Sequence, residues 1–193
     1  MADEKLIVIA GPSGAGKTTL AHELIDRYEE LEFCISATTR TPRNNETSGK
    51  DYHFFSEKDF RDAIHNEEFA EYEEVFQDIF YGTPKSELQR IWEKGHYPVL
   101  DIDVKGAFNI RKRFPDQGLF IFIHPGDENH LWARLQKRHT ESSKKLQERI
   151  KRSKEEIAHA PRFDHVIYND DLEKAKGELL SIVQRFLGLE TVS

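Results

Sequence analysis

Leu6-Ile7-Val8-Ile9-Ala10-Gly11-Pro12-Ser13-Gly14-Ala15-Gly16-Lys17-Thr18 is the stretch that decides the fold of this 193-residue chain. It opens with an uninterrupted apolar run, which is typical of a strand buried on both faces of a parallel sheet. The pattern G-x-x-x-x-G-K-T follows, and we expect a helix to begin near Lys17. A strand, this pattern and a helix in that order predict a P-loop, a turn that binds the phosphates of a nucleoside triphosphate.

The chemistry of this loop is specific. Its glycines allow the backbone to turn tightly and to bring N–H groups close to an anion, and the start of the helix adds the positive end of a dipole. Lys17 supplies a mobile charge for the β- and γ-phosphates, and the Thr18 hydroxyl can bind Mg²⁺. A glycine-rich turn without a ligand would not require every position of the pattern. The sequence therefore leaves open only which group receives the phosphoryl.

Composition limits the partners. A net charge of −7 argues against a nucleic-acid partner, because such binding depends on counterion release by basic residues. No apolar run approaches the roughly 20 residues that a membrane span needs. The single cysteine, Cys34, excludes an internal disulfide, and the residues before the first strand do not fit a signal peptide. We expect a cytoplasmic protein with no nucleic-acid partner and no membrane partner.

The order of the predicted elements indicates an α/β fold, with a parallel-sheet core that carries the P-loop and is flanked by helices. Further core strands are expected at 33–36, 97–103, 119–123 and 163–168. A polar stretch at 37–50 is expected to be a loop, and the strand–helix alternation stops there. The strands expected beyond it lie at 51–55, 69–75 and 79–81, with a helix capped by Ser56 and a break at 82–84.

We interpret the chain as a single domain, residues 1–193, with three parts. A small and mostly β insertion covers about residues 39–83, because its strands lack the βαβ order of the core. The polar and charged segment at about 126–160 is expected to form a helical lid. The core comprises about residues 1–38, 84–125 and 161–193.

Two arginines in the polar loop are candidates for a second anion site. Arg40 and Arg43 are three residues apart, and two guanidinium groups can hold a phosphate through bidentate hydrogen bonds. The alternative is a basic loop in solvent. The P-loop favours the anion site, because transfer between two nucleotides requires a second bound phosphate.

Glu71 lies among apolar residues in a predicted strand, where a carboxylate needs a partner. A guanine base would supply one, since its N1–H and N2–H₂ donors share one edge, whereas adenine has an acceptor at N1. The alternative places Glu71 in a solvated acidic run with Glu67, Glu68, Glu73 and Glu74. The residues alone favour this second interpretation.

Asp101 and Asp103 end a predicted core strand near the P-loop. A carboxylate at this edge can hold Mg²⁺ through water or bind a nucleotide hydroxyl, and alternation places both side chains on one face. Asp103 could instead cap the following helix.

Three arginines of the lid segment, Arg134, Arg138 and Arg149, are candidates for stabilising charge on the transferred phosphoryl group. Arg134 and Arg138 are four residues apart and therefore share one helix face. The basic residues around them, including Lys151 and Arg152, are interpreted as mostly solvated.

Six blocks of the chain match a known family in order: Gly11–Thr18, Ser36–Arg43, Gly49–Tyr52, Tyr81–Thr83, Leu100–Asp103 and Asn169–Asp171. With them the chain resembles guanylate kinases over essentially its whole length, and S-x-T-T-R-x-P-R and G-K-D-Y are the most specific blocks. The resemblance implies a core sheet with a GMP-binding insertion and a lid that closes over the phosphates.

The resemblance also implies a role for each matching position. Around GMP it implies guanine contacts from Ser36, Glu71 and Thr83, a phosphate clamp of Arg40, Arg43, Tyr52 and Tyr81, support from Glu46, and a contact from Asp103. Around ATP it implies Gly11, Pro12, Ser13, Gly14, Ala15, Gly16, Lys17, Thr18 and Thr19, with Asn169 near the adenine. The implied catalytic residues are Lys17, Arg40, Arg134, Arg138 and Arg149, and the implied Mg²⁺ contacts are Thr18 and Asp101.

The function that the resemblance implies is transfer of the γ-phosphoryl group of ATP to GMP with Mg²⁺, in a monomer or homodimer. Two alternatives remain. A guanylate-kinase-like binding module would have lost the transfer reaction, and a P-loop kinase could act on another small phosphorylated acceptor.

Overall fold

The computed structural model describes residues 4–43, 45–76, 78–127 and 143–189. Its larger sheet has five parallel strands in the order β2-β7-β1-β8-β9. The strands are β1 (Leu6–Ala10), β2 (Leu31–Phe33), β7 (Tyr97–Asp101), β8 (Gly118–His124) and β9 (His165–Tyr168). The predicted α/β fold with a parallel core sheet is therefore confirmed.

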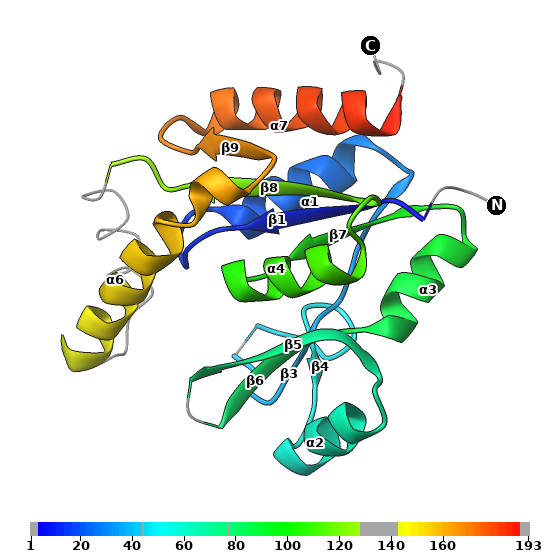
Figure 1. Cartoon of the computed structure of the whole chain (residues 1–193), viewed down its shortest axis with the longest axis vertical. Helices are drawn as coiled ribbons and strands as arrows, with labels where there is room; N and C mark the ends of the chain where they lie inside the picture. Colours follow the sequence, from blue (N-terminus) through cyan, green and yellow to red (C-terminus); the bar gives the residue numbers. More distant parts are fainter. Residues whose placement is uncertain (1–3, 44, 77, 128–142, 190–193) are drawn as a thin grey trace.

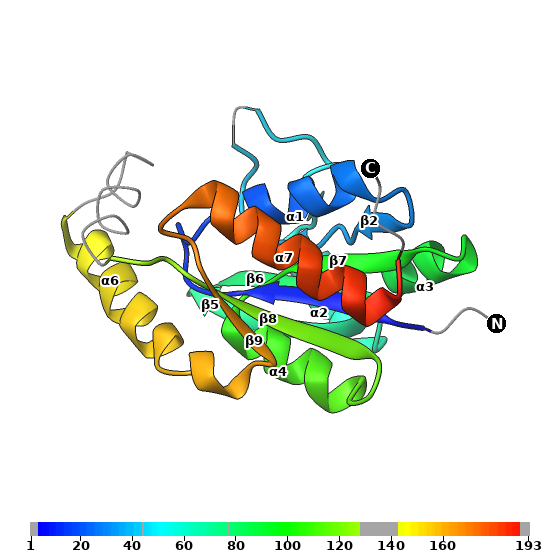
Figure 2. The ribbon, with the colours of Figure 1, turned by 90° about the horizontal axis from the view of Figure 1, so that it is seen from above.

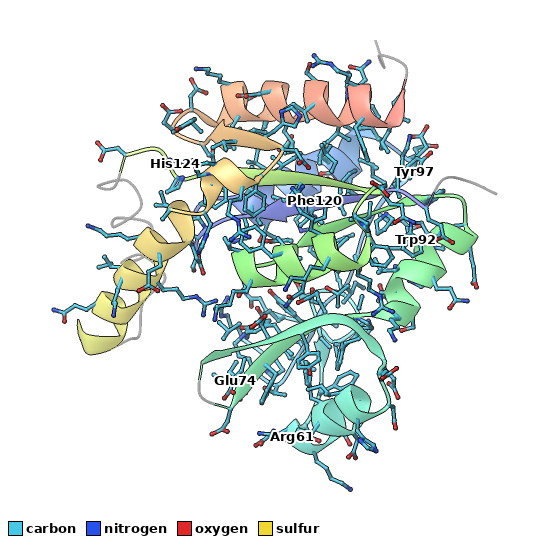
Figure 3. All side chains as sticks on the ribbon, viewed as in Figure 1. Arg61, Glu74, Trp92, Tyr97, Phe120 and His124 are labelled. Atoms are coloured by element: carbon cyan, nitrogen blue, oxygen red, sulfur yellow. The ribbon has the colours of Figure 1, made fainter. Side chains whose placement is uncertain are left out.

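Helices cover both faces of this sheet (Figure 1). Ile7 and Ile9 of β1 pack against α1 (Lys17–Arg27) and α7 (Leu172–Leu187), whereas Val8 packs toward α3 (Lys85–Glu93) and α4 (Val104–Arg113). Phe120 of β8, labelled in Figure 3, belongs to the α4 side. The alternation along β1 explains why its residues are all apolar: each face of the strand is buried by a different helix layer.

A second sheet lies beyond α4, at the end of the molecule opposite α7 (Figure 1). It has the order β4-β3-β6-β5. Its strands are β3 (Ala37–Thr38), β4 (His53–Phe54), β5 (Phe69–Phe76) and β6 (Ile79–Pro84), and α2 (Glu57–His65) packs on it through Phe60 and Ala63. Ser56 caps α2 by accepting a hydrogen bond from the backbone N–H of Asp59, as expected from the sequence.

Helix α6 (Ser143–Ile157) leads through a short 3₁₀ turn, Ala160–Arg162, into β9. It lies at the opposite end of the molecule from α3, beside the carboxyl ends of the core strands (Figures 1 and 2). Among the described residues, no helix combines the length and apolar character that a transmembrane span requires.

The structure corrects two strand predictions in the first third of the chain. Strand β2 covers Leu31–Phe33 rather than residues 33–36, because the chain leaves the core sheet after the Cys34 N–H donates to the Val99 carbonyl. The predicted loop at 37–50 begins with β3, which pairs with β4 and β6. The second sheet thus starts two residues before the expected boundary at residue 39.

Two further corrections concern strand ends at the site. The expected break at 82–84 is absent, because Gly82 pairs with Tyr72 and Thr83 pairs with Glu71, so that β6 continues to Pro84. Strand β7 ends at Asp101 rather than at residue 103. The Asp103 side chain caps α4 by accepting a hydrogen bond from the Gly106 N–H, so it does not continue the alternation of the strand.

Candidate active site

A cavity of about 670 Å³ lies between the carboxyl ends of the core strands, the second sheet and α6. It brings together residues that are far apart in the sequence. The predicted site residues that line it are Gly11, Ser13, Gly14, Gly16, Lys17, Thr18, Thr19, Ser36, Arg40, Arg43, Tyr52, Glu71, Tyr81, Asp101 and Asp103.

The first wall of the cavity is the turn between β1 and α1. Gly11 and Gly16 have φ values of 142° and 92°, which non-glycine residues rarely adopt. Both are also in close contact, since a Cβ on Gly11 would lie 2.4 Å from the Ile123 carbonyl oxygen and one on Gly16 would lie 2.3 Å from Nδ2 of Asn169. The turn therefore needs glycine at both positions, and it directs the first N–H groups of α1 toward the cavity.

Lys17 lies inside this turn. Its Nζ donates hydrogen bonds to the carbonyl oxygens of Gly11, at 2.9 Å, and Pro12, at 3.3 Å, and lies 3.9 Å from Oδ1 of Asp101. The Thr18 hydroxyl donates to the other carboxylate oxygen of Asp101. A hydroxyl and a carboxylate beside a phosphate-binding turn are the hard oxygen ligands that Mg²⁺ prefers, so these residues fit the metal.

The phosphate clamp, formed by Arg40, Arg43, Tyr52 and Tyr81 with Glu46 as its support, lies on the side of the cavity next to the second sheet. Arg40 donates to both carboxylate oxygens of Glu46, at 2.8 and 2.9 Å, and from Nε to the Tyr81 hydroxyl at 3.1 Å. The Arg40 guanidinium holds the pKa of Glu46 below its usual value. Arg43, whose side chain is 65% exposed, lies 3.8 Å from the same carboxylate. Glu46 thus holds the Arg40 guanidinium and lies near that of Arg43, and two neighbouring guanidinium groups are suited to an anion.

Tyr52 lies near both Arg40 of this clamp and Asp101 beside the P-loop. The Arg40 guanidinium lies 5.3 Å from the centre of its ring, a cation–π contact. Burial, together with the negative charge of Asp101, raises the pKa of Tyr52 to about 12, so its hydroxyl stays a proton donor at neutral pH.

The acceptor pocket consists of Ser36, Glu71 and Asp103, which line the cavity, and of Thr83, which supports Glu71 from behind. Glu71 is 7% exposed and Thr83 is fully buried, and the Thr83 hydroxyl donates to Oε1 of Glu71 at 2.7 Å. Burial raises the pKa of Glu71 to about 7, and the nearby carboxylates of Asp103 and Glu73 act in the same direction. Glu71 is therefore no member of a solvated acidic face, which corrects the interpretation that the residues alone favoured.

The carboxylates of Asp103 and Glu71 both lie close to Gly106. A Cβ on Gly106 would lie 2.8 Å from Oε2 of Glu71 and 3.2 Å from Oδ1 of Asp103. The absence of a side chain at this position lets two carboxylates approach each other in one pocket, which is costly unless hydrogen-bond donors or a cation compensate them.

Sequence reasoning missed Arg152, which it interpreted as solvated. Arg152 lines the cavity from α6 and donates to Oδ2 of Asp103 at 2.7 Å. Glu156, one turn further along α6, also lines the cavity, and burial raises its pKa while Arg152 and Lys17 act in the opposite direction. A signal was available: Arg152, Ser153 and Glu156 share one helix face by spacing, and Ser153 is buried.

Several predicted residues support the cavity from behind. Pro12, Ala15, Glu46, Thr83 and Asn169 are not among its lining residues. Asn169 is 3% exposed and donates from Nδ2 to the Ala15 carbonyl at 2.7 Å, which ties the end of β9 to the P-loop.

The lid arginines cannot be placed in the cavity. Arg134 and Arg138 lie outside the described residues, as does the predicted helix around them. Arg149 lies within α6, but its side chain is outside the described part of the chain.

The fold and the site together define a class: a P-loop α/β protein whose nucleotide turn shares one cavity with basic, tyrosine and carboxylate side chains of a second sheet. The sequence model of the family described as "Guanylate kinase" matches residues 3–186. The chain belongs to the guanylate kinase family.

Individual relatives agree with this assignment. The chain is 45% identical over 188 residues to a guanylate kinase of Salinibacter ruber, covering 97% of this chain and 99% of that protein. It is 42% identical over 189 residues to a guanylate kinase of Bacteroides fragilis, and the match covers 98% of this chain and 93% of that protein. The crystal structure of guanylate kinase from Anaplasma phagocytophilum superposes with a TM-score of 0.76 at 29% identity and covers 99% of this chain and 89% of that one.

Proposed function

We propose that this protein transfers the γ-phosphoryl group of ATP to GMP and forms ADP and GDP. The observation that carries the proposal is the buried Glu71 carboxylate, which accepts a hydrogen bond from the Thr83 hydroxyl and lines the same cavity as the P-loop. The P-loop supports a nucleoside triphosphate as donor, and the acceptor pocket supports a guanine nucleotide as acceptor.

Glu71 supplies the selectivity for guanine. Once ionised, its carboxylate can accept from N1–H and N2–H₂ of guanine together, which compensates for the cost of burying the charge. Adenine presents an acceptor at N1 and no amine at C2, so it would leave the carboxylate without a donor. The mismatch costs about 1–3 kcal/mol for each unsatisfied group, and more for a charged one.

The phosphate clamp holds the acceptor phosphate. Glu46 and Tyr81 fix the Arg40 guanidinium before GMP arrives, so little side-chain freedom is lost on binding. Arg43 and the hydroxyls of Tyr52 and Tyr81 add further donors toward the same part of the cavity.

The donor side holds the triphosphate of ATP. The backbone N–H groups between residues 11 and 19, other than the missing one of Pro12, bind phosphate oxygens together with the start of α1, and Asn169 lies near the adenine. Lys17 exchanges its bonds to the Gly11 and Pro12 carbonyls for the β- and γ-phosphates. Thr18 and Asp101 would hold Mg²⁺, which neutralises charge on the phosphates.

The transfer itself needs no covalent intermediate. An oxygen of the GMP phosphate attacks the γ-phosphorus, the bond to the β,γ-bridging oxygen breaks, and ADP leaves with the electron pair. The protein aligns the two phosphates, while Lys17, Arg40 and the lid arginines Arg134, Arg138 and Arg149 stabilise the charge of the transition state. The lid excludes water, because hydrolysis of ATP would otherwise compete. We place this reaction in the cytoplasm.

The direct test is ADP release in a coupled assay with ATP and Mg²⁺ and one of three acceptors, GMP, IMP or AMP. We expect fast turnover with GMP, slow turnover with IMP, which lacks the C2 amine, and almost none with AMP. Omission of Mg²⁺ should abolish ADP release.

Other outcomes separate the alternatives. A preference for AMP would keep the phosphotransferase and overturn the role of Glu71. No turnover in a protein that still binds GMP would favour a binding module that has lost the reaction.

A further inference from the structure

Arg152 connects three parts of the molecule with its three donor nitrogens. Nε donates to Glu156 on the same helix at 2.8 Å, Nη1 donates to the Val75 carbonyl of β5 at 2.7 Å, and Nη2 donates to Asp103 after β7 at 2.7 Å. One guanidinium group thus links α6, the second sheet and the core, and a planar fork of donors suits three separate acceptors.

The bond to Asp103 matters because of what surrounds that carboxylate. Oδ1 of Asp103 is committed to the N–H of Gly106, and Oδ2 accepts from Arg152. Both carboxylate oxygens are therefore fixed, and the plane of the group is set beside Glu71. The described cavity lining contains five carboxylates, those of Glu71, Glu73, Asp101, Asp103 and Glu156, and Arg152 lies among them from α6.

A simple surface ion pair does not describe this arrangement. The Arg152 side chain is 27% exposed, and the carboxylates of Asp103 and Glu156 are 22% and 13% exposed. Exposed pairs contribute little because water replaces them easily, whereas a partly buried carboxylate that loses its cation remains poorly solvated. Removal of Arg152 should therefore disturb the pocket that Asp103 lines.

We propose that Arg152 is a positioning residue of the acceptor pocket, which holds the Asp103 carboxylate in place for GMP and joins α6 to the β5 strand over the bound acceptor. The proposal rests on the proposed function, since it concerns the acceptor of that reaction. It assigns to α6 a part in acceptor binding in addition to the lid role expected of its segment.

The test compares Arg152→Ala and Arg152→Lys with the wild-type chain. Kinetics are measured with GMP varied at saturating ATP and with ATP varied at saturating GMP, and GMP binding alone is measured by calorimetry. Arg152→Ala should raise the KM and Kd for GMP about 10-fold or more and change the KM for ATP less than threefold. Arg152→Lys should recover part of the loss, because a lysine can still pair with Asp103.

Lys151→Ala is the matched control. Lys151 precedes Arg152 on α6, its side chain is 81% exposed, and its carboxylate neighbour, Glu155, lies 4.0 Å away. The variant removes one positive charge from the same helix without touching the cavity, and we expect wild-type kinetics. A loss equal to that of Arg152→Ala would assign the effect to net charge and overturn the proposal.

A double-mutant cycle isolates the contact with Asp103. Asp103→Asn retains a side chain that can cap α4 but lacks the negative charge. In its background, Arg152→Ala should weaken GMP binding at least threefold less than it does in the wild type. The proposal would be overturned if the losses of GMP affinity in the two single variants added up in the double variant. It would also be overturned if Arg152→Ala weakened GMP and ATP equally, because that result would indicate a role in helix stability alone.

Failure of this inference is distinguishable from failure of the proposed function. A wild-type chain without GMP-dependent ADP release contradicts the proposed function. A wild-type chain that turns over GMP, together with an Arg152→Ala variant of unchanged GMP affinity, contradicts only the role of Arg152.

Discussion

The donor and acceptor halves of the cavity are built in opposite ways. The donor half is one contiguous stretch, residues 11–19, which offers mostly backbone N–H groups from a turn with positive-φ glycines and from the start of α1. The acceptor pocket takes one side chain each from four distant positions, and Arg152 approaches it from a fifth. A backbone site tolerates changes around it, whereas a side-chain site depends on the packing of every segment that contributes to it.

The largest effect should come from Lys17, the cation of the donor half. Lys17→Ala removes the mobile cation for the β- and γ-phosphates, and we expect kcat/KM to fall by about 10³-fold or more. The fold should persist, because the glycines and α1 define the turn, and GMP binding should stay within threefold of wild type. Steady-state kinetics, circular dichroism and calorimetry with GMP measure these three properties.

Lys105→Ala, at an exposed position of α4, is the control for the loss of charge. If Lys17→Ala lost GMP binding as well, the two halves would not be separable in the way that the structure indicates.

The acceptor half should show the next largest effect. Glu71→Gln replaces one acceptor oxygen with an NH₂ donor that faces the donors of guanine, and we expect kcat/KM for GMP to fall about 100-fold at pH 8. The KM for ATP should change less than threefold. Glu68→Gln removes an exposed carboxylate nearby and should be silent. Equal losses for both substrates would remove Glu71 from the acceptor pocket.

The contrast between the halves also explains what could be predicted from the sequence. The apolar run of β1 and the following G-x-x-x-x-G-K-T pattern predicted the turn and the start of α1 near Lys17, because the spacing of these residues is itself the signal. The core strands were found by their apolar runs, although β2 was misplaced, since its buried positions depend on β7 rather than on its own pattern.

In the acceptor half, the residues alone favoured an anion site at Arg40 and Arg43, but the role of Glu71 was accessible only through the resemblance. Residue patterns favoured a solvated Glu71, and its burial becomes visible only when β6 pairs Thr83 against it. Arg152 was interpreted as solvated because its two partners outside α6, Asp103 and Val75, lie 49 and 77 residues away in the sequence. The roles of the lid arginines remain predictions, because their side chains lie outside the described residues.

A third prediction turns on the charge of Glu71 before GMP binds. In the folded chain, burial raises the pKa of Glu71 from its ordinary value of 4.5 to about 7. Folding therefore favours the neutral acid over the carboxylate. The contribution of Glu71 to stability should therefore be lost as the pH rises from about 4.5 to about 7, so the wild-type chain should lose more stability over this range than Glu71→Gln. At pH 8 we expect Glu71→Gln to be more stable by about 1–3 kcal/mol in urea unfolding, with the difference vanishing near pH 4.

This gain would accompany the loss of GMP turnover, so that one substitution trades stability against function. A Glu71→Gln chain that is less stable than wild type at pH 8 would indicate that Glu71 is already ionised and well compensated in the free protein.

The smallest effect compares two helical glycines with different surroundings. Gly106 lies in the first turn of α4, where a Cβ would stand 2.8 Å from Oε2 of Glu71, whereas Gly177 in α7 has no atom within 4 Å of the same position. Alanine favours a helix interior by up to about 1 kcal/mol over glycine. Gly177→Ala should therefore raise the free energy of unfolding by that amount and leave the kinetics unchanged.

Gly106→Ala should instead displace the Glu71 carboxylate, because a contact of 2.8 Å is shorter than real Cβ atoms show. We expect the KM for GMP to rise about tenfold, equal to about 1.4 kcal/mol, with the KM for ATP within twofold of wild type. Kinetics of both variants side by side are the measurement. If Gly106→Ala bound GMP as the wild type does, the side chains of the acceptor pocket would be able to adjust to the added methyl group. The acceptor half would then not depend on close packing, and the contrast with the backbone-built donor half would be lost.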